Sequence, residues 1–213
     1  MGNASLKIKD ITKFLTKTNR EHGVGHAINT LILHRGKNFC DEIEIIAIDL
    51  DGTLLLPDLT IAPSTILAIQ KAHQTGCRIV IATGRNVADA IRYFDFLGLP
   101  HQTYMVTNNG AIIYDLSKRD FIYSKTMSQS LIVSLFDFIN EQAIVLKHQA
   151  ATISISYLDG TNALIGSPVS SDSLEDMPRS RIAFENCGQH IPGGPIVKFL
   201  VYTPNTTPTI EVN

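Results

Sequence analysis

The chain has 213 residues, of which 44% are hydrophobic, so it is long and apolar enough to bury a core as one large domain or two small ones. This composition predicts a globular protein. The formal net charge is −2 at pH 7, but the first 40 residues carry seven Lys or Arg against two acidic residues. Such a basic segment is typical of a nucleic-acid or anionic-membrane contact or of a solvated extension, and we prefer the extension.

Cysteine spacing and hydropathy exclude several other classes. The three cysteines, Cys40, Cys77 and Cys187, are far apart in the sequence and form no Cys-x-x-Cys motif. Their spacing argues against a zinc site or a disulfide framework. No segment approaches the roughly 18 apolar residues of a membrane span, and charged residues interrupt any signal-peptide core near residue 10. We therefore predict a cytoplasmic protein with neither a membrane nor a nucleic-acid partner.

The N-terminal 43 residues are expected to form an extension. Apolar residues over 6–15 predict a short amphipathic helix, and Gly23-Val24-Gly25 should break it.

From Glu44 onward, β-prone and helix-prone segments alternate. Alternation of this kind predicts a parallel sheet covered by helices. Pro63 suits the first turn of a helix, and Gly76 suits the position just past its end. The expected strands are 44–49, 78–82 and 104–107, and the expected helices are 63–75 and 86–97.

The pattern changes after Gly110. Two short β-prone runs, 111–114 and 121–124, surround a turn-forming segment and predict a hairpin. Apolar residues then recur at helical spacing over 131–139. The remaining strand candidates are 143–148, 151–157 and 196–202, and the Gly-, Ser-, Pro- and Asp-rich segment 158–195 predicts a long loop with little regular structure.

Two carboxylates stand at the end of the first expected strand. Asp49 and Asp51 directly follow the apolar run 45–48. Residues two apart on an extended segment share a face, so both side chains can approach one substrate atom. Gly52 then allows a sharp turn. An acidic turn after a buried strand is the alternative interpretation of a bare Asp-x-Asp pattern.

Two further strand ends carry polar residues and complete an ordered set of three motifs. Thr83-Gly84-Arg85 follows the second expected strand, and Thr107-Asn108-Asn109-Gly110 follows the third. Together with the segment 49–54, these motifs resemble the haloacid dehalogenase superfamily of hydrolases. Their order is similar to that of the Cof-type branch, whose members are mostly magnesium-dependent phosphatases.

The resemblance implies a role for each motif residue. Asp49 is expected to attack phosphorus and form an aspartyl-phosphate, with Asp51 as the acid and base. Thr83 and Gly84 are expected to contact phosphate oxygens, and Arg85 to pair with phosphate or substrate oxygens. Alternatives are a helix N-cap region for Thr83 and pairing with a nearby acidic surface for Arg85.

Asn108 and Asn109 are expected to orient Asp51 or the substrate, although a plain turn is nearly as good an interpretation. Mg²⁺ is implied as the cofactor, held by the Asp49 carboxylate and the backbone carbonyl of Asp51. The implied partner is a small phosphorylated metabolite. The oligomeric state and the identity of the metabolite do not follow from the sequence.

The resemblance weakens toward the C-terminus. The family completes its site with a Lys after an inserted cap and with an acidic metal-binding segment, and neither has a convincing counterpart here. Lys198 precedes Phe199-Leu200-Val201-Tyr202 and is typical of the start of a cap strand. We therefore interpret the chain as stopping inside the cap. The first hypothesis is therefore a phosphate-monoester hydrolase whose missing motifs can leave the chain inactive. The alternatives are a non-catalytic fragment that binds phosphate or a partner protein, and a sugar phosphomutase.

The predicted fold class is accordingly α/β, with a partial Rossmann-like core built on a parallel sheet and an incomplete α/β cap. The predicted units are an N-terminal extension at 1–43, the first part of the core with its flap at 44–124, and a partial cap at 125–213.

Overall fold

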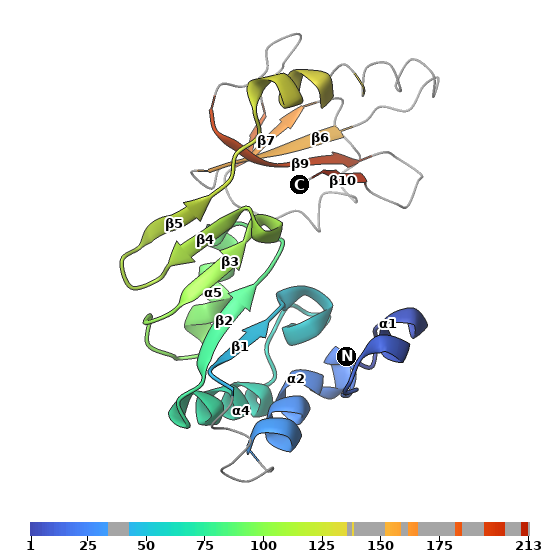
Figure 1. Ribbon diagram of the computed structural model, residues 1–213, viewed down its shortest axis with the longest axis vertical. Helices are drawn as coiled ribbons and strands as arrows, with labels where there is room; N and C mark the ends of the chain where they lie inside the picture. The colour runs from blue at the N-terminus through green and yellow to red at the C-terminus, as the bar shows by residue number, and fades with distance from the viewer. Residues whose placement is uncertain are drawn as a thin grey trace.

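The chain builds two β-sheets that follow one another along the sequence (Figure 1). A computed structural model describes residues 1–33, 43–135, 138, 152–158, 162–165, 182–184, 194–202 and 210–212. Within these residues each sheet has five strands, and the predicted α/β fold class is confirmed. No helix in these ranges has the length and apolar character needed to cross a membrane.

The first sheet has the strand order β1-β2-β3-β4-β5. Its first three strands run parallel, and β4 and β5 form an antiparallel hairpin that continues the sheet beside β3. All five strands were predicted, with ends that differ by no more than one residue. Their bounds are β1 (Ile45–Ile48), β2 (Arg78–Ala82), β3 (Tyr104–Thr107), β4 (Ile112–Asp115) and β5 (Asp120–Ser124).

The two helices that connect the parallel strands begin and end where the sequence signals predict. Helix α4 (Pro63–Gln74) has its proline in the first turn, where the missing N–H costs nothing, and Gly76 beyond its end has a φ of +102°. Helix α5 (Val87–Phe96) is capped by Asn86, whose side chain accepts a hydrogen bond from the backbone N–H of Asp89.

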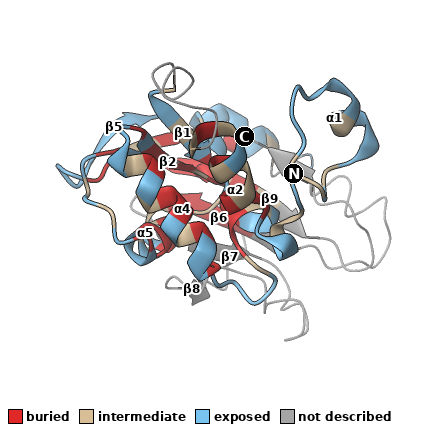
Figure 2. Ribbon diagram, turned by 90° about the horizontal axis from the view of Figure 1, so that it is seen from below, coloured by how far each residue is buried: buried red, intermediate tan, exposed pale blue. Residues whose placement is uncertain are grey.

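Apolar side chains from the parallel strands and from both helices form the main core (Figure 2). Ile81 of β2, Ile69 of α4 and Phe94 of α5 are completely buried. The strand interiors are apolar because helices cover the sheet, which is the pattern that near-continuous apolar runs predict.

The N-terminal segment differs from the prediction in two ways. Helix α1 (Leu6–Ile11) ends earlier than the apolar pattern suggested, and none of its residues is buried. Gly23, Val24 and Gly25 do not break a helix but begin one, α2 (Gly23–Ala27).

Close packing explains why glycine is tolerated in α2. A Cβ on Gly25 would lie 3.0 Å from the Cα of Thr65 in α4, so only a residue without a side chain lets the two helices approach this closely. Val24, Ile28 and Ile32 are buried in the same core cluster as the parallel sheet. The N-terminal residues therefore contribute to the core, and the boundary at residue 43 stays a prediction.

The second sheet has the strand order β10-β9-β6-β7-β8. The strands predicted at 151–157 and 196–202 are confirmed, whereas two strands within the segment 158–195 show that the loop predicted there was wrong in part. Within this segment β7 pairs with β6, and β8 pairs with β7, so the strands depend on these partners and not on the β-propensity of the local sequence. The strands are β6 (Thr152–Tyr157), β7 (Asn162–Ile165), β8 (Ile182–Phe184), β9 (Ile196–Tyr202) and β10 (Ile210–Val212).

A helix covers this second sheet at residues 129–135, within the predicted 131–139 region. Ile132 of this helix packs with Ile155 of β6 and with Phe199 of β9 in a second, smaller apolar cluster. The strand predicted at 143–148 lies outside the described residues.

We expect Ile28→Ala to destabilise the protein by about 2–5 kcal/mol, because it removes a buried side chain and leaves a cavity in the main core. Urea unfolding measures the change. Ile11→Ala is the matched control, since Ile11 is 79% exposed and its truncation should alter stability by no more than about 0.5 kcal/mol. Equal unfolding midpoints for the two variants would show that the N-terminal segment does not pack on the core.

Candidate functional site

The carboxyl ends of β1, β2 and β3 lie at the same edge of the parallel sheet, and the loops that follow them meet there (Figure 1). Backbone hydrogen bonds join the second loop to the third: the N–H of Asn108 donates to the carbonyl of Arg85, and the N–H of Asn109 donates to that of Thr83. Open α/β sheets bind ligands at this edge. All seven residues predicted for the site belong to these three loops.

The loop at residues 49–54 carries the two carboxylates, Asp49 just before the helical turn Leu50–Leu54 and Asp51 within it. Asp49 and Asp51 have extended backbones, and Leu50 between them is buried. Gly52 has a φ of +68°, a left-handed conformation that reverses the chain at little cost only for glycine. The hydroxyl of Thr53 donates to Oδ2 of Asp49 at 2.9 Å and so orients the carboxylate.

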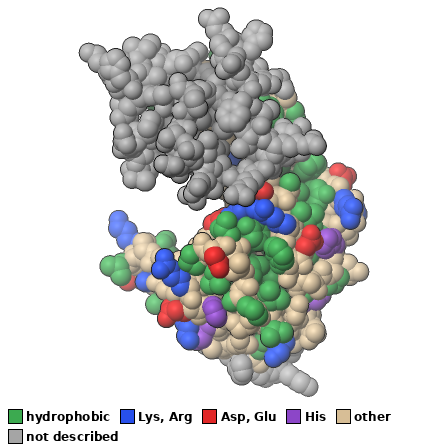
Figure 3. Space-filling view, turned by 180° about the vertical axis from the view of Figure 1, so that it is seen from behind, with side chains coloured by type: hydrophobic (Ala, Val, Ile, Leu, Met, Phe, Trp, Pro, Cys, Tyr) green, Lys and Arg blue, Asp and Glu red, His purple; other side chains and the backbone are tan. Residues whose placement is uncertain are grey.

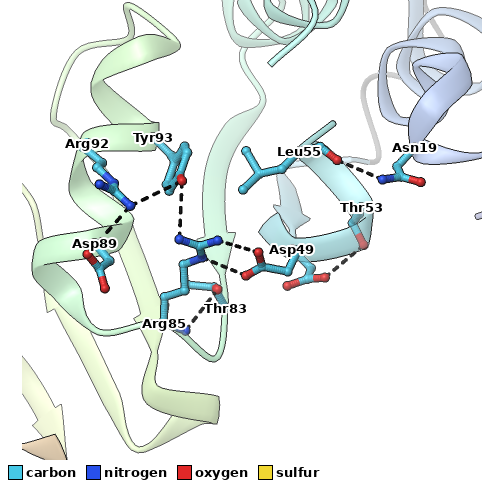
Figure 4. Close-up of polar contacts among 10 residues, drawn as sticks. Asn19, Asp49, Thr53, Leu55, Thr83, Arg85, Asp89, Arg92 and Tyr93 are labelled. Atoms are coloured by element: carbon cyan, nitrogen blue, oxygen red, sulfur yellow. Dashed lines mark hydrogen bonds and ion pairs between the residues drawn. The ribbon is translucent and has the colours of Figure 1, made fainter. Parts of the chain in front are cut away.

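Asp51 and Arg85 form a two-pronged ion pair across the loops. Figure 4 shows the guanidinium of Arg85 with dashed lines to this unlabelled carboxylate and to Tyr93. Nε of Arg85 donates to one carboxylate oxygen at 2.8 Å, and Nη2 donates to the other at 2.6 Å. These hydrogen bonds raise the pKa of Arg85 above its ordinary value, against the opposing effect of burial. The Asp51 side chain is 53% exposed, so solvent and small molecules reach it despite the pair.

Tyr93 of α5 holds the guanidinium of Arg85 in place. The ring centroid lies 5.1 Å from Cζ of Arg85, and Nη1 of Arg85 donates to the tyrosine hydroxyl at 3.3 Å. Arg92 approaches the same ring, with its Cζ 4.9 Å from the centroid. A cation against an aromatic face is favourable, and two cations sharing one ring need a nearby negative charge.

Asp89, one turn before Tyr93 on α5, supplies a carboxylate beside these cations. It is buried, and its Oδ1 lies 3.9 Å from Nη2 of Arg92. Burial raises the pKa of Asp89, while Arg92 and Arg85 act in the opposite direction. Its Oδ2 has no hydrogen-bond partner among the described residues. The sequence patterns did not predict this cluster of Asp89, Arg92 and Tyr93, because the three residues belong to a helix and form no recognisable motif.

Thr83 and Gly84 are tightly enclosed. Thr83 is 4% exposed, and its Oγ1 accepts a hydrogen bond from the backbone N–H of Arg85, which leaves the hydroxyl hydrogen to donate elsewhere. A Cβ on Gly84 would collide with Oδ1 of Asn109. A side chain at position 84 would therefore displace the amide oxygen of Asn109.

Asn108 and Asn109 both have positive φ values, 51° and 55°, which asparagine tolerates better than most residues. Asn108 is buried, and its Oδ1 has no hydrogen-bond partner within the described ranges. Asn108 and Asn109 make the tight turn that leads into β4, which agrees with the alternative interpretation of these residues as a plain turn. Asn108 also places a buried amide oxygen at the sheet edge.

Lys198 reaches this edge from the second sheet. Its Nζ donates to the carbonyl oxygen of Gly84 at 3.2 Å, across 114 residues of sequence. The sequence pattern correctly placed Lys198 in a strand but gave no reason to place it at the site. Only the pairing of β9 and the position of the second sheet bring it there.

Two asparagines of the N-terminal segment hold the carboxylate loop. Nδ2 of Asn3 donates to the carbonyl of Gly52 at 2.8 Å, and Nδ2 of Asn19 donates to that of Leu55 at 2.9 Å. The N–H of Asn19 also donates to Oδ1 of Asn3 at 3.4 Å. No sequence motif predicted these contacts.

Basic and acidic side chains lie side by side on one face of the molecule (Figure 3). The described residues contain no cluster of three or more His, Cys, Asp or Glu that could hold a metal ion. The oxygen donors present, the Asp49 carboxylate and the backbone of Asp51, match the preference of Mg²⁺ for few protein ligands supplemented by water and phosphate oxygens.

Comparison with known proteins identifies relatives of this arrangement. Residues 46–182 match the family model described as haloacid dehalogenase-like hydrolase. Pyridoxal phosphate phosphatase YbhA of Escherichia coli is 33% identical over 100 residues, covering 47% of this chain and 36% of the relative. HMP-PP phosphatase of Serratia proteamaculans is 39% identical over 69 residues, covering 32% and 24%.

The fold has counterparts among solved structures. A haloacid dehalogenase-like hydrolase from Bacteroides thetaiotaomicron superposes with a TM-score of 0.59 at 16% identity, covering 75% of this chain and 58% of that structure. The chain spans about a third of the length of the curated relatives it matches.

Asp89→Asn should become more stable than the wild-type protein as pH rises. Burial raises the pKa of Asp89 in the folded state, so the folded protein binds this proton more tightly than the unfolded chain and loses stability as the carboxyl ionises. The stability gain of the variant should therefore grow as pH increases from about 4, the ordinary value for aspartate, toward neutrality. Urea unfolding at a series of pH values measures it.

Asp58→Asn provides a control of opposite sign. Hydrogen bonds from Thr60 lower the pKa of Asp58, so this variant should lose stability relative to wild type over the same rise in pH. A pH-independent difference between Asp89→Asn and wild type would contradict the assignment of a buried, destabilising carboxylate.

Proposed function

Because the chain belongs to the haloacid dehalogenase-like hydrolases, in their Cof-type branch, we propose that it is a Mg²⁺-dependent phosphate-monoester hydrolase that works through an aspartyl-phosphate on Asp49. The observation that supports this proposal best is the position of Asp49 and Asp51 at the end of a parallel strand, in the same edge of the sheet as Thr83 and Arg85. The substrate is a small phosphorylated metabolite, the class to which the substrates in the names of the relatives belong.

Asp49 is the nucleophile in this proposal. One carboxylate oxygen attacks phosphorus, a new O–P bond forms, and the bond from phosphorus to the ester oxygen breaks. The hydrogen bond from Thr53 to Oδ2 fixes the rotation of the carboxylate and so presents its other oxygen in a defined direction. Orientation of this kind lowers the entropic part of the barrier.

Asp51 is the acid and base. It donates a proton to the departing alcohol, then takes a proton from the water that attacks the aspartyl-phosphate, so that phosphate leaves and Asp49 is regenerated. In the ion pair with Arg85 both oxygens of Asp51 are occupied by guanidinium hydrogens. Substrate phosphate competes for the same guanidinium, and its arrival releases Asp51 to carry a proton.

Thr83, Gly84 and Arg85 bind the phosphoryl oxygens. The hydroxyl of Thr83 accepts from the backbone N–H of Arg85 and donates its own hydrogen to phosphate. Gly84 presents its backbone without a side chain, so an anion can approach closely. Asn108 and Asn109 orient the substrate through their amide groups, and the hydrogen bonds between the second and third loops keep these donors together.

The Asp49 carboxylate and the backbone carbonyl of Asp51 would hold Mg²⁺. When bound, the ion neutralises the negative charge that phosphate and carboxylate bring together. Because Arg85 is already paired with Asp51, the loops alone contain too little positive charge to balance a phosphate dianion beside Asp49.

We expect the wild-type chain to hydrolyse a generic phosphomonoester such as p-nitrophenyl phosphate when Mg²⁺ is supplied, and to stop when EDTA removes the metal. Asp49→Asn should abolish turnover, since the amide cannot attack phosphorus, and Asp51→Asn should lower it by about 10²- to 10⁴-fold. The release of inorganic phosphate measures each rate.

Asp120→Asn is the control, because Asp120 is an exposed acid on β5 and its loss changes the net charge in the same way. Turnover that survives in Asp49→Asn would overturn the proposed nucleophile. Phosphate binding without turnover in the wild type would favour a non-catalytic, phosphate-binding protein, and an isomerised sugar phosphate in place of free phosphate would favour a mutase.

A further inference from the structure

A lysine of the second sheet lies against the segment proposed to hold phosphate. Lys198 is half-buried in the middle of β9, where it pairs with Ser156 of β6, and its neighbours Val197 and Phe199 are buried. The strand is therefore anchored by its apolar residues, and the position of the lysine stem follows from that packing. Its ammonium donates to the carbonyl of Gly84, between Thr83 and Arg85.

The charges of the first sheet leave a role for such a cation. Two carboxylates, Asp49 and Asp51, stand on the first loop, and the guanidinium of Arg85 is matched by Asp51. A phosphoryl group entering beside Asp49 adds further negative charge. Charge-assisted hydrogen bonds from a cation are about twice as strong as neutral ones, so a nearby ammonium favours the anion strongly.

Lysine suits this position because its ammonium is a compact charge with three donors on a flexible stem. It can serve a carbonyl and an anion together. Packing of the lysine stem alone would not require a charge there, since the stem could pack against the protein without the ammonium reaching the carbonyl of Gly84.

We propose that Lys198 is an anion-binding residue of the site, whose ammonium contacts the phosphoryl oxygens of the ligand held by Thr83 and Gly84. The inference deepens the proposed function, on which its catalytic consequence rests, but phosphate binding tests it separately. Since Lys198 belongs to the second sheet and Thr83 to the first, the bound phosphoryl group links the two sheets.

The experiment measures the dissociation constant of inorganic phosphate for the full chain by isothermal titration calorimetry, with Mg²⁺ present. Lys198→Gln keeps a donor for the carbonyl of Gly84 but removes the charge, and should weaken phosphate binding by about ten- to a hundredfold. Lys198→Arg restores a cation and should bind within about threefold of wild type, which a purely structural role for the lysine stem would not predict.

Lys71→Met is the charge control, because Lys71 is exposed on α4 and its loss should leave the dissociation constant unchanged. Thermal unfolding checks that each variant is folded, and Lys198→Met replaces Lys198→Gln if the latter is not. Phosphate binding within twofold of wild type in a folded Lys198→Gln overturns the inference. A wild-type chain that binds no phosphate also overturns the inference. Failure of both neutral variants to fold overturns it too, because it would show that Lys198 is needed for stability.

Turnover separates this inference from the proposed function. If wild type hydrolyses the phosphomonoester, Lys198→Gln should raise KM more than it lowers kcat, the signature of a contact made in the ground state. Weakened phosphate binding in a protein that never turns over would support Lys198 and reject the hydrolase. If wild type turns over and Lys198→Gln keeps normal phosphate binding and an unchanged KM, the hydrolase is supported and the role of Lys198 is rejected.

Discussion

Parallel pairing of β1, β2 and β3 determines where every polar residue of the site lies. The pairs Ile48 with Ile81 and Ala82 with Val106 bring the three strand ends level. Backbone hydrogen bonds between the second and third loops then hold Thr83 and Asn109 in contact. The site therefore depends on strand pairing and on backbone hydrogen bonds before it depends on any charged group.

The N-terminal segment completes the same scaffold from outside the sheet. Val24, Ile28 and Ile32 bury their side chains in the main core, and the amides of Asn3 and Asn19 hold carbonyl oxygens of the carboxylate loop. Gly52 turns that loop with a positive φ, and the N–H groups of Leu54 and Leu55 donate to the carbonyls of Asp49 and Leu50. The contacts from Asn3 and Asn19 add to these hydrogen bonds, and they tie residues ahead of the family-matched region to the position of Asp51.

Local signals explain why so much of the first sheet could be predicted. Alternation of apolar strands with capped helices marked β1 to β5, and Pro63 and Gly76 marked the ends of α4. The three strand-end motifs gave the site residues because parallel strands must end at one edge. Their chemical roles remain proposals, since position alone does not reveal which carboxylate attacks and which transfers a proton.

Non-local packing explains what the sequence could not predict. Glycine at 23 and 25 lowers helix propensity, yet contact with Thr65 favours a helix there. The strands β7 and β8 arise in a Gly- and Ser-rich segment because β6 offers β7 a partner and β7 in turn offers one to β8. Lys198 meets Gly84 across 114 residues, a distance that no periodic pattern spans.

The charged groups of the site come from separate segments of the chain, and the ion pair of Arg85 with Asp51 joins two of these segments. The guanidinium is held between Asp51 and the ring of Tyr93, so it already occupies a position from which it can turn toward an anion. The carboxylate of Asp89 on α5 favours the charged guanidinium, while Lys198 approaches from β9. Since each segment contributes only part of the charge, an anion at the centre would be stabilised fully only when all of them are in place. Ligand binding should therefore favour the arrangement in which both sheets and helix α5 contact the same site.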